Sequence, residues 1–472
     1  MQFFSFDFLL FLAITAIVFR VIPRRWRGHW ILLASYAFYC TWDVRMAILL
    51  LVATVFCFVA GLQIRELRNR KAASVLTLGA VSAFVLYLAF FKARPLIASG
   101  ASVAIPLGIS YYTFRLISYL LDVYWGKYDA ERQFVPFAAY VAFFPHLVAG
   151  PIQRASSFLP QLNAPQNWQS NSVLAGLARI MLGFFKKSVV ADNLGLFVDY
   201  GYQHMQSGSA IPHLAAFYLY PLQLYADFGG LTDIAIGTGL LLGIESPENF
   251  DLPFWATSIT EFWRRWHMTL TSFLRDYVFI PLRMATRSWG QFGLILSLIL
   301  IMLLIGIWHG FSMGFLAFGL FHGIALTIDT MSSSRCKKYY QRNPRVALTA
   351  AFFGPVLTYN IVSVGNTFFR APSLGSAAQM LGGLTSNLTH IGSGLSALVA
   401  PPNHYAWVAF PGLVLAEIAD WIRSHKGLKL PALAPRWIRW SAYACMTLTC
   451  IFVALLFLAR QPGADPFVYA KF

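Results

Sequence analysis

Two histidines stand alone in a long apolar stretch of the chain and could act as general bases. Residues 288–328 contain no Asp, Glu, Lys or Arg, and their readily titratable side chains are His309 and His322. Ionisable groups at membrane depth are costly and are therefore candidates for function. A desolvated imidazole stays neutral, so it can take a proton from a hydroxyl whose oxygen attacks an acyl carbon.

The surroundings of the two histidines predict different roles. His309 lies between Trp308 and Gly310, where two apolar segments meet and glycine permits a helix break, so solvent can approach the ring. His322 lies inside an apolar segment, where packing is the expected role, although it is kept with Trp308 among the expected substrate contacts. For either ring, the alternative is a structural hydrogen bond to a carbonyl of a neighbouring helix. We therefore place His309 at the catalytic centre.

A capping-box motif in the middle of the chain predicts an amphipathic helix. In residues 258–261 (Ser-Ile-Thr-Glu), the serine and the glutamate can satisfy free amides at a helix start. A helix is therefore expected to begin near residue 259. A helical period of about 100° per residue then places a polar face along residues 259–276. This face consists of Glu261, Arg264, His267, Thr271, Ser272 and Arg275.

The polar residues in and around this helix form the second group of candidate site residues. Guanidinium groups bind phosphate in a bidentate manner and indoles pack on planar rings, so the helix suits a phosphate-bearing donor. His267 is the second candidate catalytic residue, and its alternative is a solvated or interfacial histidine. The other expected substrate-binding residues are Trp263, Arg264, Arg265, Trp266, Asp227, Asp233, Glu261, Arg275 and Asp276.

The composition of the chain requires lipid as its solvent. The 472 residues are 58% hydrophobic and only 12% charged, which is more apolar surface than one soluble core can bury. Since a helix needs about 20 apolar residues to cross a bilayer, we expect an all-α polytopic membrane protein with about 10–13 crossings, some of them re-entrant. The expected spans are residues 3–22, 29–41, 44–62, 73–91, 105–125, 134–150, 173–199, 211–244, 291–309, 311–328, 346–368, 405–422 and 441–460.

Basic residues cluster in short loops, so the net charge of +17 does not indicate nucleic-acid binding. The positive-inside rule places the loops at residues 24–27, 65–71, 335–345 and 423–439 in the cytoplasm, and the spans between them then place both termini outside. Residues 3–22 follow no basic segment and precede no small-residue cleavage pattern, so they are expected to remain as the first helix.

One membrane domain is expected, because no fixed repeat or low-complexity tract divides the chain. It covers residues 1–472, with a catalytic core at about 105–330 and a C-terminal tail at 461–472. The five cysteines show neither a disulfide framework nor a metal-binding spacing. No metal site is therefore predicted.

Six collinear stretches carry a recognisable set of motifs. They are residues 105–114 (IPLGISYYTF), 143–152 (FFPHLVAGPI), 225–237 (YADFGGLTDIAIG), 247–250 (PENF), 259–268 (ITEFWRRWHM) running on to 274–277 (LRDY), and 308–310 (WHG). Any one alone is a weak signal, but the ordered set is specific. The chain thus resembles the membrane-bound O-acyltransferase family, and within it the bacterial branch of the alginate O-acetyltransferase membrane subunit.

The resemblance implies a ring of helices around a thin, funnel-shaped centre, where cytoplasmic acyl-CoA meets an acceptor from the other side. The family's essential histidine falls on His309, and its second frequently implicated histidine falls on His267. The tail, residues 467–472 (FVYAKF), resembles a C-terminal motif of this branch in which a tyrosine hydroxyl carries the acyl group, so Tyr469 is a candidate relay. The alternative is a frayed terminus. The chain departs from the usual pattern at Gly229, Leu231 and Ala470.

The function expected from the resemblance is transfer of an acyl group, most simply acetyl, to hydroxyls of an exported or cell-envelope polysaccharide. The donor is expected to be acetyl-CoA in the cytoplasm of a bacterium, the membrane its inner membrane, and no cofactor is expected to stay bound. Because the outward loops are short, a separate extracytoplasmic SGNH-type acyltransferase is an expected partner. The alternatives are D-alanyl transfer to teichoic acid and non-enzymatic transport of a glycan or lipid.

Overall fold

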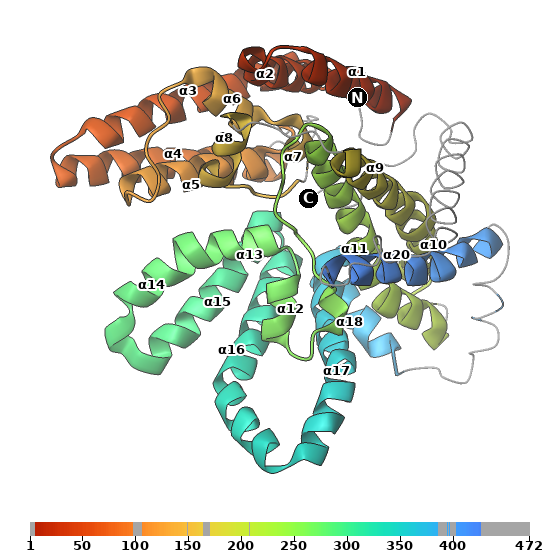
Figure 1. Cartoon of the computed structure of the whole chain (residues 1–472). Helices are drawn as coiled ribbons and strands as arrows, with labels where there is room; N and C mark the ends of the chain where they lie inside the picture. Colours follow the sequence, from red (N-terminus) through yellow and green to blue (C-terminus); the bar gives the residue numbers. More distant parts are fainter. Residues whose placement is uncertain are drawn as a thin grey trace. The chain divides into compact units, whose positions relative to one another are not determined.

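The computed structural model describes residues 5–97, 106–148, 150–163, 170–206, 208–385, 394, 396 and 403–425 (Figure 1). Every regular element in these ranges is a helix, which confirms the expected all-α class. The chain forms two compact units, and each is described by itself. Within the described ranges, the first comprises residues 5–183 and 231–248, and the second comprises residues 184–230 and 249–425. The expected span at 441–460 and Tyr469 lie outside the described residues.

The first unit is a set of helices, some of which are joined by a buried arginine. Its helices are α1 (Phe6–Val21), α2 (Arg24–Cys40), α3 (Val44–Glu66), α4 (Arg70–Ile97), α5 (Ile109–Tyr124), α6 (Phe134–Ala142), α7 (Phe144–Leu147), α8 (Ala155–Asn163), most of α9 (Ser170–Phe185) and the end of α11 (Ala210–Leu241). The guanidinium of Arg115 on α5 donates to the carbonyls of Tyr140 and Pro151 at 2.9 and 3.3 Å. A buried charge needs such partners, so these bonds tie α5 to α6 and to the chain beyond α7.

Five described helices are long and apolar enough to cross a membrane. They are Val44–Glu66, Arg70–Ala93, Arg287–His309, Met313–Arg342 and Pro344–Arg370. Each overlaps one of the expected spans. The expected span at 134–150 is instead divided between α6 and the short α7, because Pro145 cannot continue a helical hydrogen-bond ladder.

The second unit contains most of the residues predicted to do chemistry. Its elements are η1 (Lys186–Ala191), α10 (Asp192–Gln203), the first part of α11, η2 (Pro253–Trp255), α12 (Ile259–Arg265), α13 (Met268–Leu274), η3 (Arg275–Phe279), α14 (Ile280–Ala285), η4 (Arg287–Trp289), α15 (Gly290–His309), α16 (Met313–Arg342), α17 (Pro344–Arg370), α18 (Leu374–Gly383), η6 (Asn403–Val408) and α20 (Ala409–Ser424).

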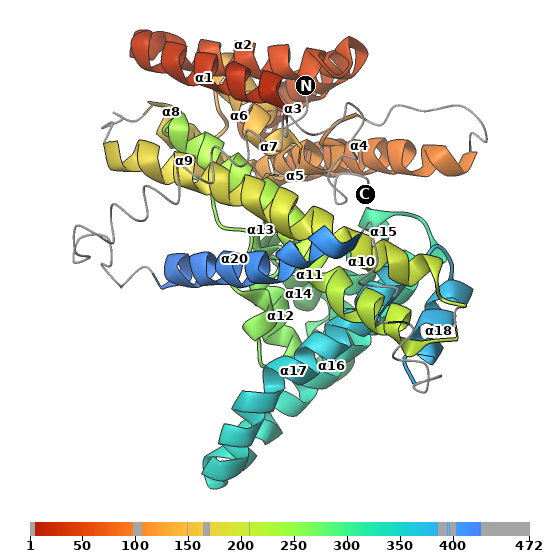
Figure 2. The same ribbon diagram turned by 90° about the vertical axis from the view of Figure 1, so that its right-hand side faces the viewer.

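Helices α15, α16 and α17 follow one another as antiparallel neighbours within this unit (Figures 1 and 2). Glycines bring the first two very close: a Cβ on Gly306 would lie 2.2 Å from the carbonyl oxygen of Phe315, and one on Gly319 would lie 2.5 Å from that of Met302. Small residues are what allow helix backbones to approach closely in a membrane. The approach holds the C-terminal end of α15, including His309, against α16.

Buried ion pairs hold another part of the second unit together. The π-helical turn η1 carries two consecutive buried lysines, Lys186 and Lys187. Lys186 Nζ lies 2.7 Å from Asp420 on α20, and the two side chains are only 2% and 0% exposed. The hydroxyl of Tyr225 and the guanidinium of Arg423 also donate to this carboxylate, at 2.6 and 2.9 Å. Since buried charges are tolerated only when paired, the network links η1, α11 and α20.

Candidate active site

A small cavity in the second unit brings the two candidate catalytic histidines together. Its volume is about 20 Å³, which is room for about one water molecule. The cavity is lined by Leu224, Trp263, Trp266, His267, Leu270, Ile305, His309, Phe318, Asn366 and Phe369. These residues come from α11, from α12 to α13, and from α15, α16 and α17, so only the folded chain assembles them.

His309 occupies the last position of α15, where the sequence predicted a helix break. Gly310 is the C-cap of this helix, and α16 begins at Met313. The half-buried imidazole packs against the rings of Trp308 and Phe369, with centroid distances of 4.5 and 4.7 Å. A histidine at a helix end, held between aromatic rings at the edge of a cavity, is positioned without being sealed from solvent.

The single amphipathic helix expected over residues 259–276 is not observed, because the chain breaks at His267. Helix α12 ends at Arg265 and α13 begins at Met268, and His267 between them has φ and ψ of 43° and 53°. The predicted start is confirmed: Ser258 Oγ accepts a hydrogen bond from the amide of Glu261 at 3.2 Å. A left-handed backbone costs a non-glycine residue about 1–2 kcal/mol. The break turns His267 inward, where it is 2% exposed, and the solvated alternative for this histidine is therefore wrong.

Asn249 holds both the break and the ring of His267. Its backbone carbonyl accepts from the amide of Met268 at 2.9 Å. Its side-chain oxygen accepts from the amide of Thr269 at 3.2 Å and lies 3.0 Å from His267 Nδ1. An oxygen that already accepts a backbone N–H is an acceptor for the ring as well, so Nδ1 of His267 carries the hydrogen and Nε2 carries the lone pair of the neutral ring. Burial lowers the pKa of His267 to about 3, which keeps the ring neutral near pH 7.

Two substitutions of Asn249 test this arrangement. Asn249→Leu removes the acceptor, and we expect the turnover number for acyl transfer to fall by about 10–100-fold, by analogy with the loss of a hydrogen-bond partner that orients a metal-binding histidine. Asn249→Asp keeps an acceptor but adds a negative charge, which raises the pKa of His267. The ring is then protonated at higher pH, so activity should decline earlier as the pH is lowered from 8 to 5.

The measurement is the pH profile of acyl transfer in membranes with matched protein levels. Full activity in the leucine variant would contradict the proposed orientation of the ring. If the activity of Asn249→Asp declined at the same pH as that of the natural protein, the contact between Asn249 and His267 would be contradicted.

Two of the predicted substrate contacts form buried ion pairs and are not among the residues that line this cavity. Asp227, in the second unit, accepts a hydrogen bond from Lys187 at 2.8 Å. Asp233, in the first unit, pairs with Arg179, whose guanidinium also binds Glu248. Both carboxylates are almost fully buried, so their structural role is to neutralise a buried cation.

The charged side chains of residues 261–276 also lie outside the set of described residues that line the cavity. Glu261 and Arg265 form an ion pair at 2.6 Å, one helical turn apart. Arg264 is exposed. Arg275 and Asp276 form a contact at 2.9 Å in which the arginine is 62% exposed. A role of these residues in binding a donor therefore remains a prediction, whereas the structure does bring Trp263 and Trp266 to the histidines.

His322 and Trp308 pack directly behind the cavity. The ring of His322 meets Trp263 and Phe318 edge-on, at centroid distances of 5.2 and 4.7 Å. On its other side, a Cβ on Gly365 would lie 2.2 Å from its Nε2 atom, so the histidine fills a space left by that glycine. The ring of Trp308 lies 6.0 Å from that of His267. Both side chains support the walls of the cavity.

Asn366 is a polar lining residue that was not predicted from the sequence. It lies on α17 and is 6% exposed. The feature of the sequence that could have indicated it is an amide side chain inside the expected apolar span at 346–368. Such a residue must find hydrogen bonds inside the membrane protein or face a polar space.

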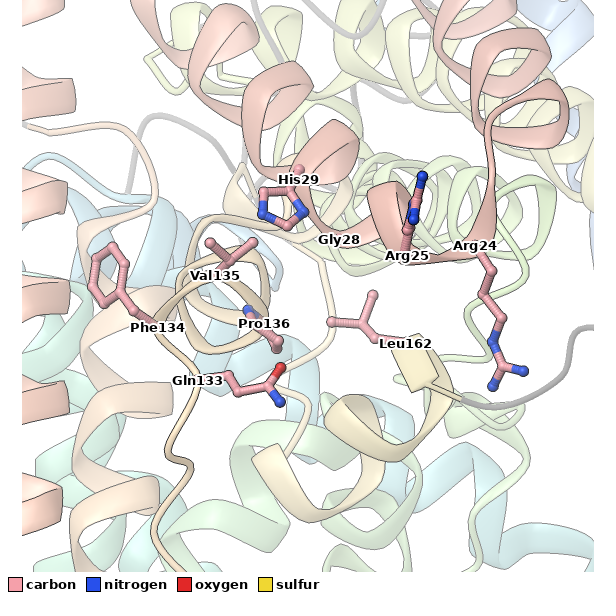
Figure 3. Close-up of a pocket in the computed structure, with 9 residues that line it drawn as sticks. All are labelled: Arg24, Arg25, Gly28, His29, Gln133, Phe134, Val135, Pro136 and Leu162. Atoms are coloured by element: carbon pink, nitrogen blue, oxygen red, sulfur yellow. The ribbon is translucent and has the colours of Figure 1, made fainter.

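A much larger cavity, of about 590 Å³, lies in the first unit. It is formed by the start of α2 and α6 and the end of α8, and Figure 3 shows the side chains of Arg24 and Arg25 pointing in different directions. None of the residues that line it was predicted to take part in catalysis. The small cavity, and not the larger one, therefore marks the candidate active site.

Helices that can cross a membrane, together with two histidines meeting in one cavity, define the class as a multi-pass membrane protein with a potential acid–base site. The family model described as MBOAT, membrane-bound O-acyltransferase family, matches residues 131–363. The chain is 36% identical to a probable alginate O-acetylase of Pseudomonas putida over 80% of this chain and 78% of that protein. The chain belongs to the membrane-bound O-acyltransferase family and is an O-acyltransferase.

Other relatives show the range of the family. The chain is 30% identical to the peptidoglycan O-acetyltransferase of Helicobacter pylori, over 94% of this chain and 91% of that protein. It is 32% identical to the teichoic acid D-alanyltransferase of Streptococcus thermophilus, over 60% of this chain and 73% of that protein. Among these relatives, the alginate and peptidoglycan enzymes are similar over a larger share of the chain.

Proposed function

We propose that this protein transfers an acetyl group from cytoplasmic acetyl-CoA towards hydroxyl groups of an exported or cell-envelope polysaccharide. The observation that carries the proposal is the cavity in which His309 and His267 meet, since acyl transfer to a hydroxyl needs a positioned base. The names of the alginate and peptidoglycan relatives support a polysaccharide acceptor. We place the protein in the inner membrane of a bacterium, with both termini on the extracytoplasmic side.

In the proposed reaction, His309 takes the proton of an acceptor hydroxyl as its oxygen attacks the carbonyl carbon of the acetyl thioester. Negative charge develops on the carbonyl oxygen, and the new C–O bond forms. The C–S bond then breaks, and His309 gives the proton to the departing CoA thiolate. His267, neutral and fixed by Asn249, would position or stabilise the reacting groups from within the same cavity.

The size of the cavity implies that its lining moves during the reaction. About 20 Å³ holds one water molecule but not an acetyl group. Aromatic side chains, among them Trp263, Phe318 and Phe369, form much of the wall. Rotation of such side chains would admit the donor and the acceptor, and their return would exclude water from the thioester.

Incubation of the purified protein with acetyl-labelled acetyl-CoA tests the proposal. We expect release of free CoA and appearance of the label on the protein or on an added acceptor. A transporter would neither release CoA nor acquire the label, so the absence of both from a folded preparation would overturn the enzymatic proposal in favour of transport.

We further propose that Tyr469 receives the acetyl group from the site and presents it on the outer side to an SGNH-type acyltransferase. The basis is the resemblance of residues 467–472 to the C-terminal motif of the branch. Tyr469→Phe removes the accepting hydroxyl while keeping the ring. We expect the tail peptide, isolated after proteolysis, to carry the label in the natural protein and to lack it in the variant. Equal label in both would refute the relay.

Transfer of D-alanine is the second candidate, because the chain is 32% identical to a teichoic acid D-alanyltransferase over 60% of its length. The two activities differ in the acyl group that is transferred, because a D-alanyl group carries an amino group and an acetyl group does not. A direct competition between acetyl and D-alanyl thioesters separates them. Preference for the D-alanyl donor would overturn the acetyl assignment and leave the base role of His309 intact.

A further inference from the structure

One buried amide in the active-site cavity is not used by the reaction as described above. Asn366 lies on α17, is 6% exposed, and lines the cavity together with His267 and His309. One helical turn later, Phe369 packs its ring 4.7 Å from that of His309. Residues three apart share one face of a helix, so α17 presents Asn366 and Phe369 to the same cavity.

The hydrogen bonding of Asn366 differs from that of another asparagine on the same helix. Asn360 accepts from the hydroxyl of Tyr218 at 3.0 Å and donates to the carbonyl of Val356 at 2.8 Å. The side chain of Asn366 makes no hydrogen bond to any other residue that the structure describes. The amide atoms of Asn366 are not among the fully buried polar atoms that lack a partner, so they face accessible space, and the residue lines the cavity. The amide is therefore available to a group that enters the cavity.

We propose that the side-chain amide of Asn366 donates a hydrogen bond to the carbonyl oxygen of the transferred acyl group. This inference rests on the proposed function, in which negative charge develops on that oxygen as the acceptor hydroxyl attacks. A preorganised N–H donor, once water is excluded by the bound reactants, stabilises such charge more in the transition state than in the ground state. His309 then moves the proton, and Asn366 holds the oxyanion.

The test compares three variants of Asn366 with a matched variant of Asn360. Asn366→Leu keeps most of the volume but removes the donor, and we expect the turnover number with acetyl-CoA to fall by about 10²–10³-fold, with little change in KM. Asn366→Ser retains a smaller donor and should recover part of the rate. Asn360→Leu should keep the turnover number and lose thermal stability, because its two hydrogen bonds are to the protein.

Each outcome separates this inference from the proposed function. Absence of turnover with acetyl-CoA in the natural protein would overturn both. Turnover in the natural protein, with an unchanged turnover number in Asn366→Leu, would overturn only the role of Asn366, and so would a change confined to KM. If the leucine variant fails to accumulate in the membrane, Asn366→Ala decides, since it removes the donor and leaves only a small apolar side chain. Full activity of that variant would also overturn the role.

Discussion

Replacing His309 by alanine is expected to lower the rate of acyl transfer by about 10²–10⁴-fold, which is the usual contribution of a positioned general base. The imidazole stands at the end of α15 and lines the cavity that also contains His267. Without it, the acceptor hydroxyl has no group on that wall to take its proton. The effect should appear as a loss of acetyl ester on the envelope polysaccharide of cells that still hold the protein in their membranes.

A second substitution distinguishes the loss of the base from a loss of packing around His309. His309→Gln keeps a polar side chain between Trp308 and Phe369 but cannot act as a base at neutral pH. The matched control is His204→Ala, since His204 is exposed at the end of α10 and stacks only on Tyr200 among the rings of the described residues. Normal ester content in His309→Gln would refute the catalytic role, and loss of ester in His204→Ala would show that the assay responds to histidine loss in general.

Removing the carboxylate of Asp420 is expected to give the largest loss of stability from a single substitution in the second unit. Lys186, Tyr225 and Arg423 all donate to this buried group. Breaking a buried pair by removing one partner costs about 3–5 kcal/mol, because the other charge stays in a medium that solvates it poorly. We expect Asp420→Ala to lower the thermal unfolding temperature of the purified protein markedly and to reduce its level in the membrane.

An exposed ion pair in the same unit is the control for this prediction. Asp199 pairs with Arg370 at 2.9 Å, with side chains 52% and 34% exposed. A pair of this kind contributes at most about 1 kcal/mol, so Asp199→Ala should change the unfolding temperature little. Equal losses in the two variants would contradict the argument from burial. The double variant Lys186→Met with Asp420→Leu should recover part of the loss, because no lysine charge is then left without its partner.

The spanning helices were predictable because their signal is local. An uninterrupted run of about 20 apolar residues has few alternatives to a helix in lipid, and the expected spans at 44–62 and 73–91 correspond to helices at Val44–Glu66 and Arg70–Ala93. The break after His309 was predictable for a similar reason, since Gly310 follows directly in the sequence.

The break at His267 was not predictable from local pattern. The capping motif at 258–261 and the polar period of residues 259–276 favour a continuous helix. The bonds that hold His267 in its left-handed conformation come from Asn249, which lies 18 positions earlier in the chain. A helical period carries no information on such a distant partner. The predicted start of the helix was therefore right, and its predicted continuation to residue 276 was wrong.

The partners of buried charges were also decided only by the tertiary structure. Asp227 and Asp233 were recognisable in the sequence as carboxylates in apolar surroundings. Their cations, Lys187 and Arg179, come from a different helical segment. Because a buried carboxylate can equally serve a substrate or an internal cation, only the pairing distinguishes the two roles.

By itself, the sequence determined the class of fold, the main apolar spans, the family motifs and the identity of the two histidines, because each depends on residue type and on spacing along the chain. The tertiary structure decided that His267 and His309 share one cavity, that Asn249 orients one of them, and that Asn366 belongs to the same site. These relations join helices far apart in sequence, and they depend on packing and hydrogen-bond geometry that exist only when the second unit is folded.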